Sequence, residues 1–241
     1  MPILPPRGTG SGGKGSGGID RRLMIGAAIA VAGLAAVQLY PRLTSTSPRA
    51  SVLGDRVSLD QLMAPGPLPD LMWGKPEAPV TIVEFASMTC GHCGEFHKLV
   101  WPKLEEKYIR TGKARLILRE YPIDQLALFA AMLGRCAGPE KGRELIGEMF
   151  KAQSTWAVGE TGKPAAELTK LWEAQGLPKA EFQACAEKTD LMGQLTAARS
   201  RAKSVFAIKG TPTFFVNGYR VTGPTDTIDT FDAAFAEIAK R

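Results

Sequence analysis

The sequence is poor in the side chains from which metal sites are built. It has two histidines, His92 and His97, and four cysteines, of which Cys136 and Cys185 each stand alone in the chain. A structural zinc site needs four ligands, whereas Cys90 and Cys93 supply only one pair. We therefore expect no metal and no cofactor, and we keep a copper- or zinc-binding module as an alternative.

Surplus positive charge is also scarce over most of the chain. The net charge is +6, but residues 1–50 hold six basic residues and one acidic residue, which leaves 24 basic and 23 acidic residues for 51–241. A folded domain that binds nucleic acid needs a basic surface of its own, so we expect no nucleic-acid partner. With 44% hydrophobic and 22% charged residues, the chain is not wholly disordered, collagenous or a coiled coil.

The N-terminal segments predict export. Residues 1–22 are rich in Gly and Ser and should form a flexible cytoplasmic tail, and residues 23–40 form an uncharged apolar run directly after Arg21 and Arg22. Basic residues next to an apolar segment tend to stay in the cytoplasm, so Arg21 and Arg22 predict that the chain after residue 40 lies in the periplasm. We expect residues 23–40 to be an uncleaved inner-membrane anchor. A cleaved or twin-arginine signal and a buried core helix remain alternatives.

Residues 41–69 are rich in Pro, Ser and small residues and predict a linker, with a short helical turn at 58–63. After it, residues 80–86 (VTIVEFA) predict a buried strand, and apolar residues at helical spacing predict a helix over 93–110, kinked at Pro102. The motif Cys90-Gly91-His92-Cys93 then falls between the strand and the helix.

That position favours thiol chemistry. The free N–H groups of a helix start stabilise a thiolate, so Cys90 is predicted to be the nucleophile and Cys93 the cysteine that resolves the mixed disulfide. His92 between them could add positive charge or a hydrogen bond to the Cys90 thiolate, which would make the disulfide more oxidising.

Two segments carry a resemblance to a known family. Residues 81–97 (TIVEFASMTCGHCGEFH) and 210–218 (GTPTFFVNG) resemble the active-site region and the cis-proline loop of DsbA-like thiol:disulfide oxidoreductases of the thioredoxin superfamily, of the alphaproteobacterial type. The resemblance covers the chain from Leu68 to its C-terminus. It implies an α/β protein with a thioredoxin fold, formed by residues 70–122 and 204–241, and an inserted helical domain at 123–203, where the hydrophobic periodicity is helical throughout.

The resemblance also implies roles for individual residues. Pro212 would lie beside Cys90, with the Thr211 backbone as an edge for substrate peptide and with Met88 and Thr89 also in contact with substrate. Glu84 would carry protons to and from Cys93, and the alternative is that its side chain points to solvent at a sheet edge.

The function so implied is a periplasmic oxidase that introduces disulfides into reduced exported proteins through its own redox-active disulfide. A DsbB-type, quinone-linked membrane protein would re-oxidise it. Gly91 stands where the best-known family member has proline, and the Gly-His pair is similar to that of protein disulfide isomerases. An isomerase or a reductase that uses the same cysteines therefore remains the alternative.

The two remaining cysteines, Cys136 and Cys185, fall at the ends of separate predicted helices. In an oxidising compartment such thiols are expected to join, and two free buried cysteines are the alternative. Some alphaproteobacterial DsbA-like proteins carry a comparable second disulfide, which suggests a structural role.

Overall fold

A computed structural model describes residues 50–157 and 163–241 of the chain. The predicted tail and apolar segment, residues 1–22 and 23–40, lie outside the described residues. None of the helices within the described ranges is long and apolar enough to cross a bilayer.

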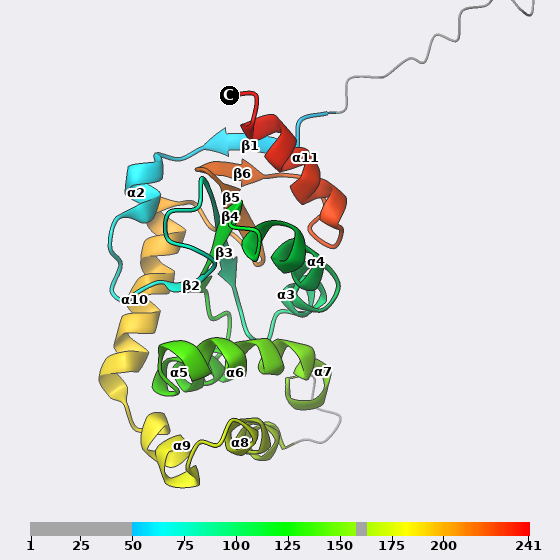
Figure 1. The fold of residues 1–241 in the computed structure, drawn as a ribbon. Coiled ribbons are helices and arrows are strands. Elements are labelled where there is room, and N and C mark those ends of the chain that lie inside the picture. The colour runs from blue at the N-terminus through cyan, green and yellow to red at the C-terminus, as the bar shows by residue number, and fades with distance from the viewer. Residues whose placement is uncertain (1–49, 158–162) are drawn as a thin grey trace, which may run out of the picture. The chain divides into compact units, whose positions relative to one another are not determined.

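The centre of the fold is a six-stranded mixed sheet in the order β1-β6-β5-β3-β4-β2 (Figure 1). Strand β3 pairs in parallel with β4 and antiparallel with β5, and the outer pairs are all antiparallel. The strands are β1 (Leu53–Arg56), β2 (Leu71–Trp73), β3 (Val80–Ala86), β4 (Ala114–Glu120), β5 (Thr213–Val216) and β6 (Tyr219–Val221).

Strand β3 has the β-branched and apolar composition of a strand covered on both faces, and six of its seven residues are buried. Successive side chains point to opposite faces of a sheet. Ile82 packs into a core with Phe96 and Phe214, whereas Phe85 packs on the other face with Phe206 and Phe215. Glu84 is in phase with Ile82, so its carboxylate points to the face on which Phe96 lies.

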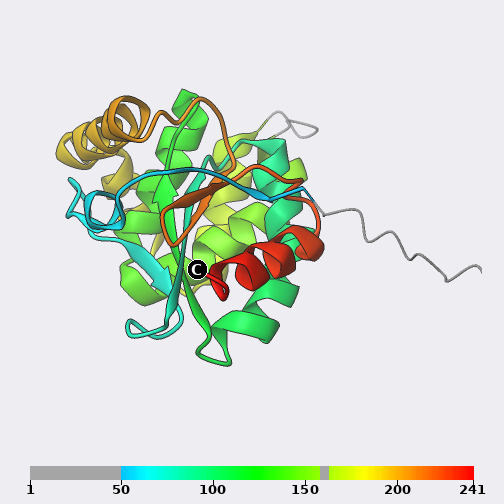
Figure 2. The same ribbon diagram turned by 90° about the horizontal axis from the view of Figure 1, so that it is seen from above.

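That face is covered by α11 (Ile228–Ile238) and by a helix that changes its hydrogen bonding along its length. The second helix consists of α3 (Gly91–Glu95), the π-helical turn η1 (Phe96–Val100), α4 (Trp101–Leu104) and the π-helical turn η2 (Glu105–Ile109). Figure 2 shows α11 and α10 on different sides of the strands. The kink predicted at Pro102 takes the form of these π-turns, because Pro102 opens α4 where no amide hydrogen is required.

Strands β5 and β6 form the predicted hairpin. Asn217 and Gly218 both have positive φ, at 47° and 86°, which is the geometry of a type I′ turn. Asn217 also fixes the turn to β3, because its side-chain oxygen accepts a hydrogen bond from the Thr81 N–H at 2.8 Å.

The linker prediction for residues 41–69 is wrong in its second half. Leu53–Arg56 forms edge strand β1, paired with β6, and the predicted turn is α2 (Leu59–Met63), capped by Ser58. Leu62 is fully buried in the core that contains Phe85. Only one residue of β1 is buried, so its sequence carries too little alternation to predict a strand.

The helical insertion follows β4 and lies at the lower end of the sheet in Figure 1. It contains α5 (Gln125–Cys136), α6 (Pro139–Lys151), α7 (Gln153–Trp156), α8 (Pro164–Ala174), α9 (Lys179–Ala186) and α10 (Thr189–Val205). Its core also takes in Ala86, Cys90 and Cys93, so the insertion packs directly against the end of β3 and the start of α3.

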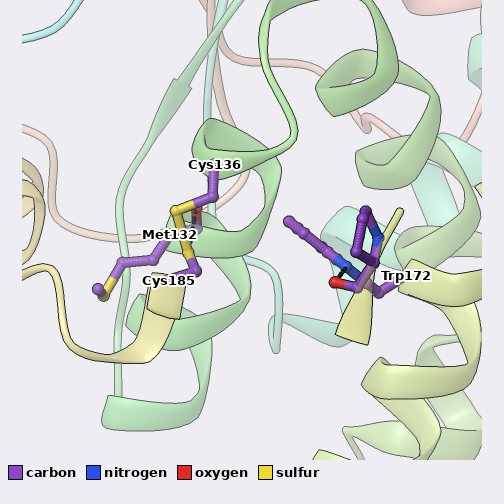
Figure 3. The surroundings of a disulfide bond; sticks show 5 residues. Met132, Cys136, Trp172 and Cys185 are labelled. Atoms are coloured by element: carbon purple, nitrogen blue, oxygen red, sulfur yellow. Dashed lines mark hydrogen bonds between the residues drawn. A yellow bond between two sulfur atoms is a disulfide. The ribbon is translucent and has the colours of Figure 1, made fainter. Parts of the chain in front are cut away.

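A disulfide between Cys136 and Cys185 joins the end of α5 to the end of α9 (Figure 3). The two Cα atoms are 6.0 Å apart, and Cys185 is fully buried. The expectation that these cysteines join is confirmed, and the alternative of two free thiols is excluded.

Candidate active site

The motif begins where β3 ends. Cys90 is the N-cap of α3, and its backbone is held by a hydrogen bond from its own N–H to the Ser87 carbonyl at 3.1 Å. Its carbonyl accepts from the Gly94 N–H, also at 3.1 Å. Cys90 and Cys93 are both free thiols in this structure, so the pair is in its reduced form. Cys93 is fully buried, whereas Cys90 keeps 9% of its surface exposed. The nucleophile assigned from the sequence is therefore the more exposed residue of the pair.

The two thiols differ strongly in acidity. The pKa of Cys90 is lowered to about 5, first by a hydrogen bond from the Cys93 thiol, and further by the Thr211 side chain and by backbone hydrogen bonds from Cys93 and His92. Desolvation opposes this effect. The pKa of Cys93 is raised well above its usual value, first by burial, then by its hydrogen bond to Cys90 and by the negative charge of Glu84.

The loop before β5 lies against Cys90. The Thr211–Pro212 peptide bond is cis, and the Thr211 carbonyl oxygen lies 3.1 Å from the Cys90 sulfur. This loop borders an open cleft of about 560 Å³, which Lys209 and Arg220 also line. The structure thus brings together Cys90, Pro212 and Thr211, although 118 positions separate Cys93 from Thr211.

Glu84 is fully buried and does not lie at a solvent-exposed edge. Its two carboxylate oxygens lie 3.1 and 3.0 Å from Nε2 of His97. His97 is itself 5% exposed and stacks on Phe150, with ring centroids 4.0 Å apart and an angle of 4° between the planes. The sequence analysis did not assign a role to His97. A signal was present, because His97 follows Cys93 by four positions and so shares its helix face.

The structure also places three other predicted site residues, whose roles stay predictions. The His92 side chain is exposed, and it is the backbone of His92 that helps to lower the pKa of Cys90. The Met88 side chain is 2% exposed and packs in the core, which leaves little of it for a substrate. The Thr89 hydroxyl donates a hydrogen bond to Asp124, the N-cap of α5, at 2.6 Å. Thr89 thus ties the active-site loop to the helical insertion.

Gln153 of α7 is a further site residue that the sequence analysis missed. Its buried amide nitrogen donates to the carbonyl oxygens of Met88 and Cys90, both at 2.9 Å. It therefore holds the backbone on both sides of Thr89. Gly94 leaves room for this contact, because a Cβ there would lie 2.2 Å from the Gln153 side-chain oxygen. No local pattern links positions so far apart in the sequence.

The arrangement of the histidines, cysteines and carboxylates can be compared with that of a metal site. In residues 50–157 and 163–241, no group of three or more His, Cys, Asp or Glu side chains is placed to hold a metal ion. His97, the buried histidine, directs Nε2 at Glu84 rather than at the cysteine sulfurs.

Comparisons with known proteins agree with this geometry. The thioredoxin family model matches residues 68–235, which is more than half of the chain. A Rickettsia prowazekii protein named "Putative protein-disulfide oxidoreductase" is 31% identical over 150 residues, which are 62% of this chain and 54% of that protein. The matched region thus spans about half the length of the curated relatives.

Among solved structures, alpha-DsbA1 of Wolbachia pipientis is 28% identical with a TM-score of 0.65, over 77% of this chain and 100% of that one. Oxidised BdbD of Bacillus subtilis shares the fold, at 18% identity and a TM-score of 0.62, over 79% of this chain and 100% of that one. The α/β thioredoxin fold with a helical insertion is confirmed, and the chain belongs to the thioredoxin family, with DsbA-like proteins among its similar members.

Proposed function

We propose that this protein is a thiol:disulfide oxidoreductase that introduces disulfides into exported proteins through Cys90 and Cys93. The observation that carries the proposal is the opposed acidity of the two thiols, with the pKa of Cys90 at about 5 and that of Cys93 well above its usual range. A stabilised Cys90 thiolate favours the reduced pair. The oxidised pair therefore tends to accept electrons from other thiols.

The reaction begins when a substrate thiolate attacks the Cys90 sulfur of the oxidised pair. The Cys90–Cys93 bond breaks, a mixed disulfide with Cys90 forms, and Cys93 leaves and takes up a proton. A second substrate thiolate then attacks the substrate sulfur, which forms the substrate disulfide and releases Cys90 as a thiolate. Because Cys90 is the more acidic thiol, it is the better leaving group in this second step. Substrate loses two electrons, and the cysteine pair gains them.

The cleft beside the cis-proline loop is the proposed docking place for the substrate chain. An extended peptide can pair with the exposed backbone of Gly210 and Thr211, which would bring a cysteine of that peptide to the Cys90 sulfur 3.1 Å from the Thr211 carbonyl. Reduced exported proteins of varied sequence are suitable partners, because recognition through the backbone requires few particular side chains.

Two cysteine variants test the assignment of roles. Cys90→Ser should abolish exchange, because the attacking and attacked sulfur is lost. Cys93→Ser should accumulate mixed disulfides with substrate proteins, because the serine hydroxyl that replaces the Cys93 thiol cannot displace the substrate from Cys90. Cys136→Ser is the matched control, since it also removes one cysteine but lies away from the redox pair. An active Cys90→Ser protein would refute the proposal.

The proposed compartment is the periplasm, with residues 23–40 as an inner-membrane anchor and a DsbB-type, quinone-linked protein as the re-oxidant. The Cys136–Cys185 disulfide supports an oxidising compartment. Alkaline phosphatase fused behind Arg241 should be active, because that enzyme needs export, and an inactive fusion would refute the location. Membrane fractions that contain quinone should re-oxidise the reduced protein, and membranes stripped of quinone should not.

A further inference from the structure

The cleft beside the cis-proline loop carries more positive than negative charge. Its lining holds two basic residues, Lys209 and Arg220, and one acidic residue, Asp55. The charge of Arg220 is already matched, because its Nε lies 3.0 Å from a carboxylate oxygen of Asp55. The guanidinium also donates to the Phe206 carbonyl at 2.8 Å and lies over the Phe215 ring. Arg220 and Asp55 therefore form a fixed part of the wall and together add no net charge.

Lys209 carries the remaining charge of the cleft. It is exposed, and within residues 50–157 and 163–241 it has no ion pair. A Cβ on the neighbouring Gly210 would meet nothing within 4 Å, so the space in front of this part of the loop is open. A bound chain that brings a carboxylate here can pair with Lys209 without breaking an existing ion pair.

The backbone on both sides of Lys209 is held in place. The Tyr121 hydroxyl donates a hydrogen bond to the carbonyl of the buried Ile208 at 3.1 Å. The Thr213 hydroxyl donates to the Gly210 carbonyl at 2.7 Å. These two hydrogen bonds fix where Lys209 starts from the loop, so its charge has a defined place beside the cleft.

That place is close to the reactive sulfur. Lys209 comes two positions before Thr211, whose carbonyl oxygen lies 3.1 Å from the Cys90 sulfur. Two residues of extended chain span at most about 7 Å. This span is shorter than the Debye length of about 8 Å at physiological salt, so screening leaves part of the interaction. A substrate whose cysteine lies at Cys90 thus brings the residues two positions from that cysteine within range of the Lys209 charge.

We propose that Lys209 makes this protein prefer substrate segments with Glu or Asp two positions from the reacting cysteine. The inference rests on the proposed function and adds a substrate class to it. A basic residue at the same place would meet a like charge and bind less well. In the oxidised protein Cys90 belongs to a disulfide and carries no charge, so no thiolate opposes an acidic segment before the exchange. Once the exchange releases Cys90 as a thiolate, like charges favour departure of the product.

Three peptides of equal length test the preference. Each has one cysteine, with Glu, Gln or Lys at the second position on both sides of it. Oxidised full-length protein is mixed with an excess of peptide at low ionic strength, and the rate constant for reduction of the Cys90–Cys93 disulfide is measured. The charges of the peptide also change the acidity of its own thiol. The readout is therefore the ratio of the Glu to the Lys rate constant, compared between protein variants, in which this contribution cancels.

Lys209→Glu reverses the charge in the cleft, and Lys179→Glu is the matched control. Lys179 is also exposed and opens α9, which lies at the far end of α10 from the loop (Figure 1). Helix α10 has 17 residues and is therefore about 25 Å long. We expect Lys209→Glu to lower the Glu-to-Lys ratio by about threefold or more, as an exposed ion pair allows, and Lys179→Glu to leave it unchanged. The effect of Lys209→Glu should shrink at about 0.5 M salt.

Lys209→Gln, which removes the charge without reversing it, should give a ratio between those of Lys209→Glu and the unsubstituted protein. An equal ratio in Lys209→Glu and the unsubstituted protein would overturn the preference. An equal fall in Lys209→Glu and Lys179→Glu would also overturn it, because the cause would then be net charge. If none of the three peptides reduced the unsubstituted protein, the proposed function itself would fail.

Discussion

Replacing Cys93 with alanine should raise the pKa of Cys90. The hydrogen bond from the Cys93 thiol is the largest cause of the lowered pKa of Cys90, and alanine removes it. A hydrogen bond to a charged group contributes about 1.5–3 kcal/mol, and about 1.4 kcal/mol corresponds to one pH unit. The midpoint of thiolate formation should therefore move upward by about one to two pH units. It should stay below the value of a free cysteine, because the backbone N–H groups of α3 remain.

The assay is a pH titration of the ultraviolet absorbance of the Cys90 thiolate. The matched control is Cys93→Ser, which keeps a hydroxyl donor at the same place and should keep the midpoint low. Equal midpoints for the alanine and serine variants would refute the assignment of the Cys93 hydrogen bond as the main cause. A midpoint near about 8.5 in both variants would show that the start of the helix does not lower the pKa of Cys90.

Three further results are expected. The thiolate exists only in the reduced protein, and the pKa of Cys90 is lowered from 9.0 to about 5, so the reduced form should gain stability over the oxidised form as pH rises from about 5 to 9 and lose it as pH falls through about 5. The gain at pH 7 is at most about 3 kcal/mol before solvent screening. Denaturant unfolding of both forms across this pH window is the assay, and parallel stability curves would contradict the expectation. Cys136→Ser should keep thiol exchange but lower the unfolding free energy by about 4 kcal/mol, since it opens a loop spanning 49 positions, and an unchanged melting temperature would argue against a structural role. Glu120→Gln should cost about 3–5 kcal/mol in chemical denaturation, because it leaves the buried Arg135 guanidinium, 2.6 Å from its carboxylate, without a counter-charge. Glu105→Gln, at an exposed ion pair, is its control and should cost at most about 1 kcal/mol.

Much of the central sheet could be predicted because its strands are apolar and bounded by clear signals. The bounds of β3 and β4, the Asn217–Gly218 turn and the position of Cys90 at a helix start all follow from local sequence. Strand β1 could not be predicted, because an edge strand with a single buried residue has little hydrophobic alternation. Its place is decided by pairing with β6, which is distant in the sequence.

The candidate site was predictable in its reactive atoms and less so in the residues that support them. Cys90, Cys93 and Pro212 lie in motifs that can be recognised in the sequence. Gln153 acts through contacts that exist only after the insertion folds against the loop. The side-chain role of His92 was assigned from its place in the motif; the structure shows that side chain exposed, and the role stays a prediction.

The central claim is that the Cys90–Cys93 disulfide is an oxidant, and the most direct test is its reduction potential at equilibrium with glutathione. The fraction of reduced protein can be measured at defined ratios of reduced to oxidised glutathione. The account predicts a potential above about −200 mV, because the lowered pKa of Cys90 stabilises the reduced pair. A potential near about −270 mV, in the range of thioredoxin-type reductants, would contradict it.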